Sequence, residues 1–185
     1  MNPAIIVVDM LKDTFKKEAH FAITSEALSI IPNIKRLLGQ GRMRAWPIIF
    51  ACDSFLEGDF IFQGRMKPHS IRGTKGAEVI DDLNPLAMEV VLAKRRFSAF
   101  FKTDLDQTLR TLGVDTVVVT GISTHVCVIL TAMDALSHDF RSVIIEDCCA
   151  AHKKEVHRAA LDLYRDFPLY PLLRILSLEE FLGEC

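Results

Sequence analysis

Short runs of Val, Ile and other apolar residues alternate with longer amphipathic segments along most of this chain. A short continuous apolar run is typical of a strand buried on both faces, because helices cover both sides of a parallel sheet. Regular alternation of such strands with helices predicts a mainly parallel, doubly wound α/β sheet of about six strands. The predicted strands cover 4–8, 45–51, 89–93, 116–121, 142–147 and 171–176.

Helical periodicity fills the intervals between these strands. Gly39 and Gly41 are expected to end the first helix. Strands and helices together predict a three-layer, Rossmann-like α/β/α domain over residues 1–185, since no linker, repeat or low-complexity tract divides the chain. The segment 52–83 breaks the alternation and is predicted to be a loop or lid insertion beside a site. The predicted helices cover 24–40, 103–112, 124–137, 153–166 and 178–183.

The overall charge is nearly balanced, with 22 Lys and Arg against 24 Asp and Glu and a formal net charge of -2. A nucleic-acid-binding protein is expected to carry a basic surplus, which this chain lacks. The N-terminal apolar run stops at Asp9, too short for a signal peptide or a membrane span, so we expect a cytoplasmic protein without a membrane partner. Its five cysteines are odd in number and include no C-x-x-C pair, which fits reduced thiols.

Polar residues at the carboxyl ends of the predicted strands are the first candidates for a site, because ligands of doubly wound sheets bind there. They are Asp9, Asp53, Lys94 and, just past the strand 116–121, Cys127. Each alone has an ordinary structural explanation: a turn or helix cap for Asp, a surface position for Lys, and apolar packing for Cys. Together they predict one site, provided that the first, third and fourth strands lie side by side.

Cys127 is the candidate nucleophile of that site. If Ser123 or Thr124 caps the following helix, the thiol lies in its first turn, where the helix dipole and free N–H groups lower a thiol pKa. The same N–H groups suit an oxyanion forming on a substrate carbonyl. Asp9 is then placed to accept the thiol proton and pass it to a leaving amine, and Lys94 to favour the thiolate.

Five stretches occur along the chain in this order: VVDM with Asp9, KPHSIRGTKGAEV from Lys67, KRRFSAF from Lys94, GISTHVCVILTAMDAL around Cys127, and EDCCAA from Glu146. The ordered set resembles the isochorismatase-like cysteine hydrolases, a superfamily that includes nicotinamidases and N-carbamoylsarcosine amidases. Each stretch alone is a weak signal, but the set is specific and spans nearly the whole chain.

The resemblance implies roles for these residues. Asp9, Lys94 and Cys127 match a catalytic triad, with Asp9 as general base and acid, Lys94 as its electrostatic partner, and Cys127 as the nucleophile that forms an acyl-thioester. The resemblance also implies a cis peptide bond between Ile122 and Ser123, with the backbone N–H groups of Ser123 and Cys127 forming the oxyanion hole. Self-association into a homo-oligomer is implied in the same way.

One departure from the family pattern concerns a metal. Nicotinamidases of this family bind a metal through an Asp-x-His pair and a second His downstream, and the matching residues here are Asp53, Phe55 and His69. Phe55 has no ligand atom, and two protein ligands are fewer than the three expected for catalytic zinc. We therefore expect no metal cofactor, or at most a weak zinc at Asp53 and His69. His69 is expected to be a hydrogen-bonded loop residue, with Asp53 as a candidate partner.

The predicted function is a cysteine-dependent amidase, similar to N-carbamoylsarcosine amidases, that cleaves a C–N bond of a small carbamoyl or carboxamide compound and releases ammonia. Three alternatives stay open: a nicotinamidase, an isochorismatase-type vinyl-ether hydrolase, and a non-catalytic binding protein with an oxidation-prone thiol. Phe15, Phe55 and Phe97 are candidates to contact the substrate. Candidate cations for a substrate carboxylate are Arg65, Lys67, Arg72 and Arg95.

Overall fold

The computed structural model describes residues 1–16 and 21–185. Its centre is a six-stranded parallel sheet with the order β3-β2-β1-β4-β5-β6. The doubly wound α/β prediction is confirmed, because the chain winds outward from β1 to β3 and then returns to add β4 on the other side of β1. The strands are β1 (Pro3–Val8), β2 (Ile48–Asp53), β3 (Val90–Lys94), β4 (Thr116–Ile122), β5 (Arg141–Ala150) and β6 (Leu173–Leu176).

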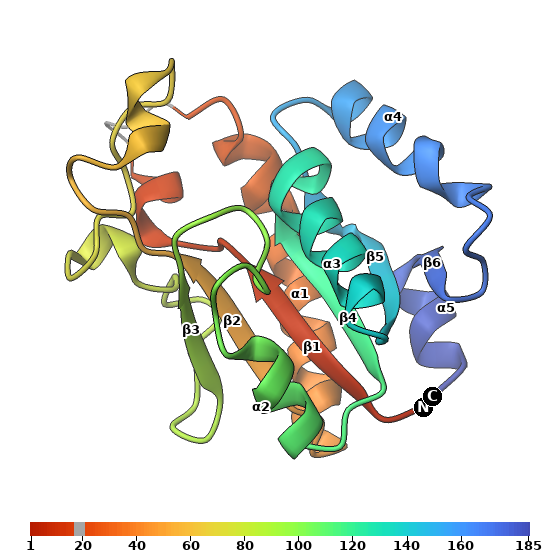
Figure 1. Cartoon of the computed structure of the whole chain (residues 1–185). Helices are drawn as coiled ribbons and strands as arrows, with labels where there is room; N and C mark the ends of the chain where they lie inside the picture. The colour runs from red at the N-terminus through yellow and green to blue at the C-terminus, as the bar shows by residue number, and fades with distance from the viewer. Residues whose placement is uncertain (17–20) are drawn as a thin grey trace.

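Helices cover both faces of the sheet, with α1 behind it and α2 and α3 in front in the view of Figure 1. Successive strand residues point to opposite faces. In β1, Ile5 and Val7 belong to the apolar cluster that includes residues of α1 and α5, whereas Ala4 and Ile6 belong to the cluster on the other face, with residues of α2, α3 and α4. None of the helices in the described part of the chain is long and apolar enough to cross a membrane. The helices are α1 (Thr24–Met43), α2 (Leu105–Thr111), α3 (Ile129–Ser137), α4 (Lys154–Arg165) and α5 (Leu178–Gly183).

One predicted neighbour relation is wrong. β1 pairs with β2 on one side and with β4 on the other, and β3 pairs with β2 at the edge of the sheet. The reason is topological, because each crossover of the first half places the next strand beside the previous one until the winding reverses. The carboxyl end of β2, with Asp53, therefore lies between the ends of β1 and β3.

α1 runs past the two glycines that were expected to end it. Gly41 faces the sheet, where a Cβ would lie 2.5 Å from Ile5 Cδ1, so this glycine is a packing residue of the helix. The helix ends at Met43, and Ala45 follows with a φ of 54°. Trp46 N–H donates to Gly41 O over 2.9 Å. The first residues of the predicted strand 45–51 therefore close the helix, and β2 begins after them.

The predicted helix 124–137 consists of two pieces. Its first turn, Thr124–Val128, is π-helical and leads into α3. Ser123 occupies the N-cap position without a side-chain capping bond, and its carbonyl accepts a hydrogen bond from Val128 N–H over 3.3 Å. The Thr124 hydroxyl shares a hydrogen bond with His157 Nδ1 of α4 over 2.8 Å. The prediction that the Ser123 or Thr124 side chain caps the helix is therefore wrong, because tertiary contacts hold this turn.

The segment 52–83 packs against the loops that follow β1 and β3. It contains two short 3-10 helices, Phe60–Gln63 and Lys75–Ala77. Ser70 N–H donates to Asp13 Oδ2 over 2.7 Å, which ties the segment to the loop after β1. Asp59, whose side chain is fully buried, accepts hydrogen bonds from Arg95 and Arg96 directly after β3. These contacts fix one wall of the cavity at the carboxyl ends of the strands.

Candidate active site

Three charged side chains meet where β1, β2 and β3 end. Asp9 directly follows β1, Asp53 is the last residue of β2, and Lys94 is the last residue of β3. The fully buried Lys94 ammonium donates to Asp9 Oδ2 over 2.8 Å and to Asp53 Oδ1 over 2.5 Å. Asp53 N–H donates to Asp9 Oδ1 over 2.8 Å. The Asp9 carboxylate is therefore oriented through both of its oxygens.

The sequence predicted Asp53 as a member of this site but assigned it no ionic role, so its hydrogen bond with Lys94 was not foreseen. Asp53 and Lys94 are register partners in the β2–β3 ladder, so their side chains start from neighbouring backbone positions. Placing β2 between β1 and β3 would have revealed the contact. Strand order was thus the missing information, since Asp53 itself had already been noted at a strand end.

A close approach of β1 and β4 brings the candidate nucleophile to this cluster. Gly121 has a φ of 102°, and a Cβ there would lie 2.1 Å from the Val8 carbonyl oxygen, so only glycine fits. The next peptide bond, Ile122–Ser123, is cis, and the π-helical turn follows it directly. Cys127 lies in that turn and is buried. One ligand atom each of Asp9, Asp53 and Cys127 lie within 4.8 Å of one another.

The environment of the thiol favours its neutral form. Burial, followed by the negative charge of Asp9, raises the pKa of Cys127 well above its usual value, and Lys94 only partly opposes this. The predicted lowering of this thiol pKa is therefore wrong, because the turn is buried and a carboxylate faces the sulfur. Burial and then Asp9 raise the pKa of Asp53 to about 7. Burial opposes the charged form of Lys94, but Asp9, Cys127 and Asp53 outweigh it and raise the pKa of that ammonium.

An open cavity of about 310 Å³ lies over these groups, with Asp9, Asp53 and Cys127 in its lining. Of the three phenylalanines predicted to contact a substrate, Phe55 and Phe97 line this cavity. Phe15 does not, because it packs against the apolar cluster on the α1 face of the sheet. Most of the cavity surface is apolar. We call this surface the apolar wall, and it consists of Leu11, Phe21, Ala22, Ile23, Phe55, Met66, Phe97, Ile122 and Val126.

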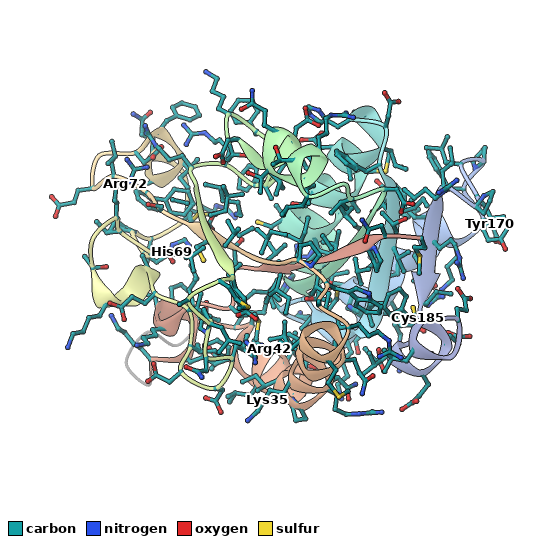
Figure 2. All side chains as sticks on the ribbon, turned by 90° about the horizontal axis from the view of Figure 1, so that it is seen from below. Lys35, Arg42, His69, Arg72, Tyr170 and Cys185 are labelled. Carbon is teal, nitrogen blue, oxygen red and sulfur yellow. The ribbon has the colours of Figure 1, made fainter. Side chains whose placement is uncertain are left out.

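Two histidines also line the cavity. His69, which Figure 2 labels in the loops at one end of the molecule, makes its hydrogen bond with Lys67 O over 2.9 Å and not with Asp53, the candidate partner named above. Its ring meets the ring of Phe55 edge-on, with centroids 5.5 Å apart. The centroid of the His152 ring lies 5.5 Å from the centroid of the His125 ring. His152 was not among the predicted site residues, because the strand before it was predicted to end at 147, whereas β5 extends to Ala150.

The predicted cationic residues lie outside this lining. Arg72 Nε donates to Ser54 Oγ over 3.0 Å, and Arg95 Nη2 donates to Asp59 Oδ2 over 2.8 Å. Arg65 and Lys67 are exposed. None of the four candidate cations therefore lies in the described lining of the cavity.

A thiol, a carboxylate and a buried ammonium at the strand ends of a doubly wound sheet form a site suited to thiol-dependent hydrolysis. The Isochorismatase domain model matches residues 3–172, so the chain belongs to the isochorismatase family.

Relatives of known structure extend over nearly the whole chain. N-carbamoylsarcosine amidase from Thermoplasma acidophilum is 29% identical with a TM-score of 0.84, covering 97% of this chain and 98% of that one. Pyrazinamidase of Pyrococcus horikoshii, in complex with zinc, is 27% identical with a TM-score of 0.84, covering 96% and 99%.

Ureidoacrylate amidohydrolase of Yersinia enterocolitica is 29% identical over 207 residues, covering 97% of this chain and 83% of its own length. With such relatives, this protein is a hydrolase that acts on amide C–N bonds.

Zinc in the pyrazinamidase complex raises the question of whether these residues fit a metal. Asp53 Oδ1 already accepts a 2.5 Å hydrogen bond from Lys94, and Phe55 offers no ligand atom. Asp9, Asp53 and Cys127 are close enough to share an ion, but the Lys94 ammonium occupies the space between the two carboxylates. A divalent cation would have to displace a buried ammonium from both of its partners. The residues present therefore do not fit the metal.

Proposed function

We propose that the protein is a cysteine-dependent amidohydrolase that cleaves a C–N bond of a small carbamoyl or carboxamide substrate through a thioester and releases ammonia. The observation that carries this proposal is the position of Cys127 beside Asp9 in the lining of the cavity, with their ligand atoms within 4.8 Å. A carboxylate this close to a thiol takes its proton once the two groups approach to hydrogen-bond distance as the sulfur attacks.

The proposed reaction has two halves. Cys127 Sγ attacks the amide carbonyl carbon while its proton moves to Asp9, and the oxyanion that forms accepts hydrogen bonds from Ser123 N–H and Cys127 N–H. Collapse of this intermediate breaks the C–N bond, and the leaving nitrogen takes the proton from Asp9 and departs as ammonia. Water then loses a proton to Asp9 and attacks the thioester. The carboxylic acid leaves, and the proton returns to the thiolate.

In this reaction the neutral resting thiol is useful, because Asp9 receives a proton only if the thiol still holds one. The raised pKa of Cys127 therefore fits concerted attack and proton transfer, in place of a thiolate formed in advance. Lys94 offsets one of the two buried carboxylate charges and keeps Asp9 in position. We assign Lys94 as a positioning residue, because its ammonium is fully buried and lies outside the cavity lining.

Replacing the nucleophile tests this function. Cys127→Ala is expected to reduce ammonia release from a panel of small carboxamides by at least about 10³-fold, because both halves of the reaction pass through the sulfur. Rapid quenching of the wild type with a poor amide substrate, followed by mass spectrometry, is expected to show the acyl group on Cys127. The proposal is overturned if Cys127→Ala hydrolyses the amides as fast as the wild type.

A wild-type thiol that reacts with alkylating reagents but turns over no amide would instead favour the non-catalytic alternative.

The predicted cytoplasmic location and homo-oligomeric state stay predictions.

A further inference from the structure

The turn that carries Cys127 has a backbone conformation that needs support. Val128 N–H donates to Ser123 O over 3.3 Å. Ile129 N–H donates to Thr124 O, and both bonds span five residues. A π-helical turn of this kind is rare and occurs mostly as a single turn at a functional site. Contacts that hold this turn also hold the proposed nucleophile and the proposed oxyanion donors.

A side-chain hydrogen bond connects the start of this turn to another helix. Thr124 is fully buried, and its hydroxyl oxygen lies 2.8 Å from Nδ1 of His157. α4, which carries His157, begins beside the turn in Figure 1, and the two elements are in contact. A buried hydroxyl that loses its partner is destabilised, because water cannot replace the bond. The bond to His157 therefore favours the observed position of Thr124.

His157 is the polar member of the buried face of α4. Ala160 and Leu161 follow it by three and four residues and Tyr164 by seven, so all four side chains lie on one face of the helix. Ala160 and Leu161 belong to the apolar cluster on the α3 face of the sheet, and Tyr164 packs against it. This packing anchors α4, and the anchored helix holds the imidazole against Thr124.

The imidazole also lines a second cavity of about 430 Å³, which lies between α1, β5 and α4. Burial lowers the pKa of His157, and the positive charge of Arg158 acts in the same direction, against Glu146. The ring is therefore neutral at neutral pH, and a threonine hydroxyl can match either the lone pair or the proton of a neutral Nδ1. The other charged groups of this cavity are Glu26 of α1, Asp147 of β5 and Lys154 of α4.

We propose that His157 is a positioning residue of the active site, which holds the turn in its π-helical form through Thr124 and so keeps Cys127 beside Asp9. His157 lies outside the lining of the catalytic cavity, so it acts through the turn and not on the substrate. A displacement of about 1 Å at a reacting group can cost about 10²-fold in rate. The inference rests on the proposed amidase function for its kinetic test.

Two substitutions of nearly equal shape test this role. Leucine and asparagine are branched at the same atom, but only the asparagine amide can form a hydrogen bond with Thr124. His157→Leu is expected to lower kcat for small carboxamides at least about tenfold and to change KM less than about threefold. His157→Asn is expected to recover most of this loss. Equal losses of kcat in the two variants, or an unchanged kcat in His157→Leu, overturn the inference.

A double-mutant cycle assigns the effect to the hydrogen bond. Thr124→Val keeps the shape of the side chain and removes the hydroxyl. Because both substitutions remove the same bond, His157→Leu combined with Thr124→Val is expected to lose no more kcat than either alone, whereas additive losses overturn the inference. Tyr164→Phe is the matched control on the same face of α4, two turns further on, and is expected to leave kcat unchanged. A loss in Tyr164→Phe as large as in His157→Leu also overturns the inference.

Hydrogen exchange separates this inference from the proposed function, because it needs no turnover. Amides in the peptide 121–130 are expected to exchange at least about fivefold faster in His157→Leu than in the wild type, and at nearly the wild-type rate in His157→Asn. If the wild type cleaves no amide, the proposed function fails alone and this comparison decides the inference. Equal exchange in the two variants overturns it. If His157→Leu does not fold, Thr124→Val and Thr124→Ser provide the same comparison, because serine keeps the hydroxyl.

Discussion

At the scale of single residues, the site depends on a few positions with strict geometric requirements. Asp9 and Lys94 are catalytic and positioning candidates because their charges are paired in a buried place, and Cys127 because its thiol lies against that pair. Gly121 matters for a different reason, since its missing Cβ allows β4 to approach Val8 closely enough to bring these groups together.

Gly121→Ala is expected to lower the free energy of unfolding by about 3 kcal/mol or more. The new Cβ would meet the Val8 backbone at 2.1 Å, and alanine at a φ of 102° is strained. Urea denaturation monitored by circular dichroism measures the change. Gly58→Ala is the matched control, because no atom lies within 4 Å of its Cβ position, and it is expected to change the stability by less than about 0.5 kcal/mol. Equal stability of the two variants would refute the packing argument.

The raised pKa of the Cys127 thiol predicts a particular pH dependence of alkylation. A thiol reacts as its thiolate, and burial with the Asp9 charge keeps that fraction small at neutral pH. The rate of carbamidomethylation of Cys127 by iodoacetamide is therefore expected to rise about tenfold per pH unit through pH 9 without a plateau. Peptide mass spectrometry follows this residue separately from the other four cysteines. A plateau already reached below pH 7.5 would show a lowered thiol pKa instead.

At the scale of secondary-structure elements, the ends of helices depart most from the sequence-based expectations. α1 continues through Gly39 and Gly41, and the predicted helix after β4 starts as a π-helical turn held by His157. α5 matches its predicted bounds because Ser177 and Glu180 form a capping box, a local signal that needs no tertiary partner. Helix ends are predictable where local chemistry decides them and unpredictable where packing does.

The turn after α3 allows a stabilising substitution. Asp139 has a φ of 62° and is exposed, and the αL region costs an Asp side chain more than it costs glycine. Asp139→Gly is expected to raise the free energy of unfolding by about 0.5–1 kcal/mol. At the end of α4, Asp166 has a φ of -100°, so Asp166→Gly is expected to give no gain. Thermal unfolding measures the stability of both variants. A gain in stability from Asp166→Gly alone would contradict the argument from the positive φ of Asp139.

At the scale of the whole molecule, the segment 52–83 becomes part of the site through a few charged contacts. Asp59 connects it to Arg95 and Arg96, which directly follow Lys94 in the chain. The same residues thus tie the segment 52–83 to the chain directly after the edge strand β3. The loop is fixed by contacts between residues far apart in sequence, because its own sequence provides little regular structure.

Asp59→Asn is expected to loosen this wall. The asparagine keeps the size of the side chain but removes the charge that pairs with two guanidinium groups. Limited proteolysis is expected to cut within 54–83 faster than in the wild type, with a higher KM for amides and a smaller change in kcat. Glu57→Gln is the control, because Glu57 is an exposed residue of the same segment. An unchanged rate of proteolysis in Asp59→Asn would mean that the contacts of Asp59 with Arg95 and Arg96 do not hold the segment.

The sequence alone determined the fold class and the positions of Asp9, Lys94 and Cys127, because alternating apolar runs and polar strand ends are local patterns that repeat along the chain. The tertiary structure decided which of these groups touch. β2 lies between β1 and β3, so Asp53 joins the ion cluster and burial raises the thiol pKa. The tertiary structure also decided which charged groups line the cavity, because Arg72 binds Ser54 and Arg95 binds Asp59. Burial and charge pairing depend on distances between residues far apart in the chain, which no local pattern contains.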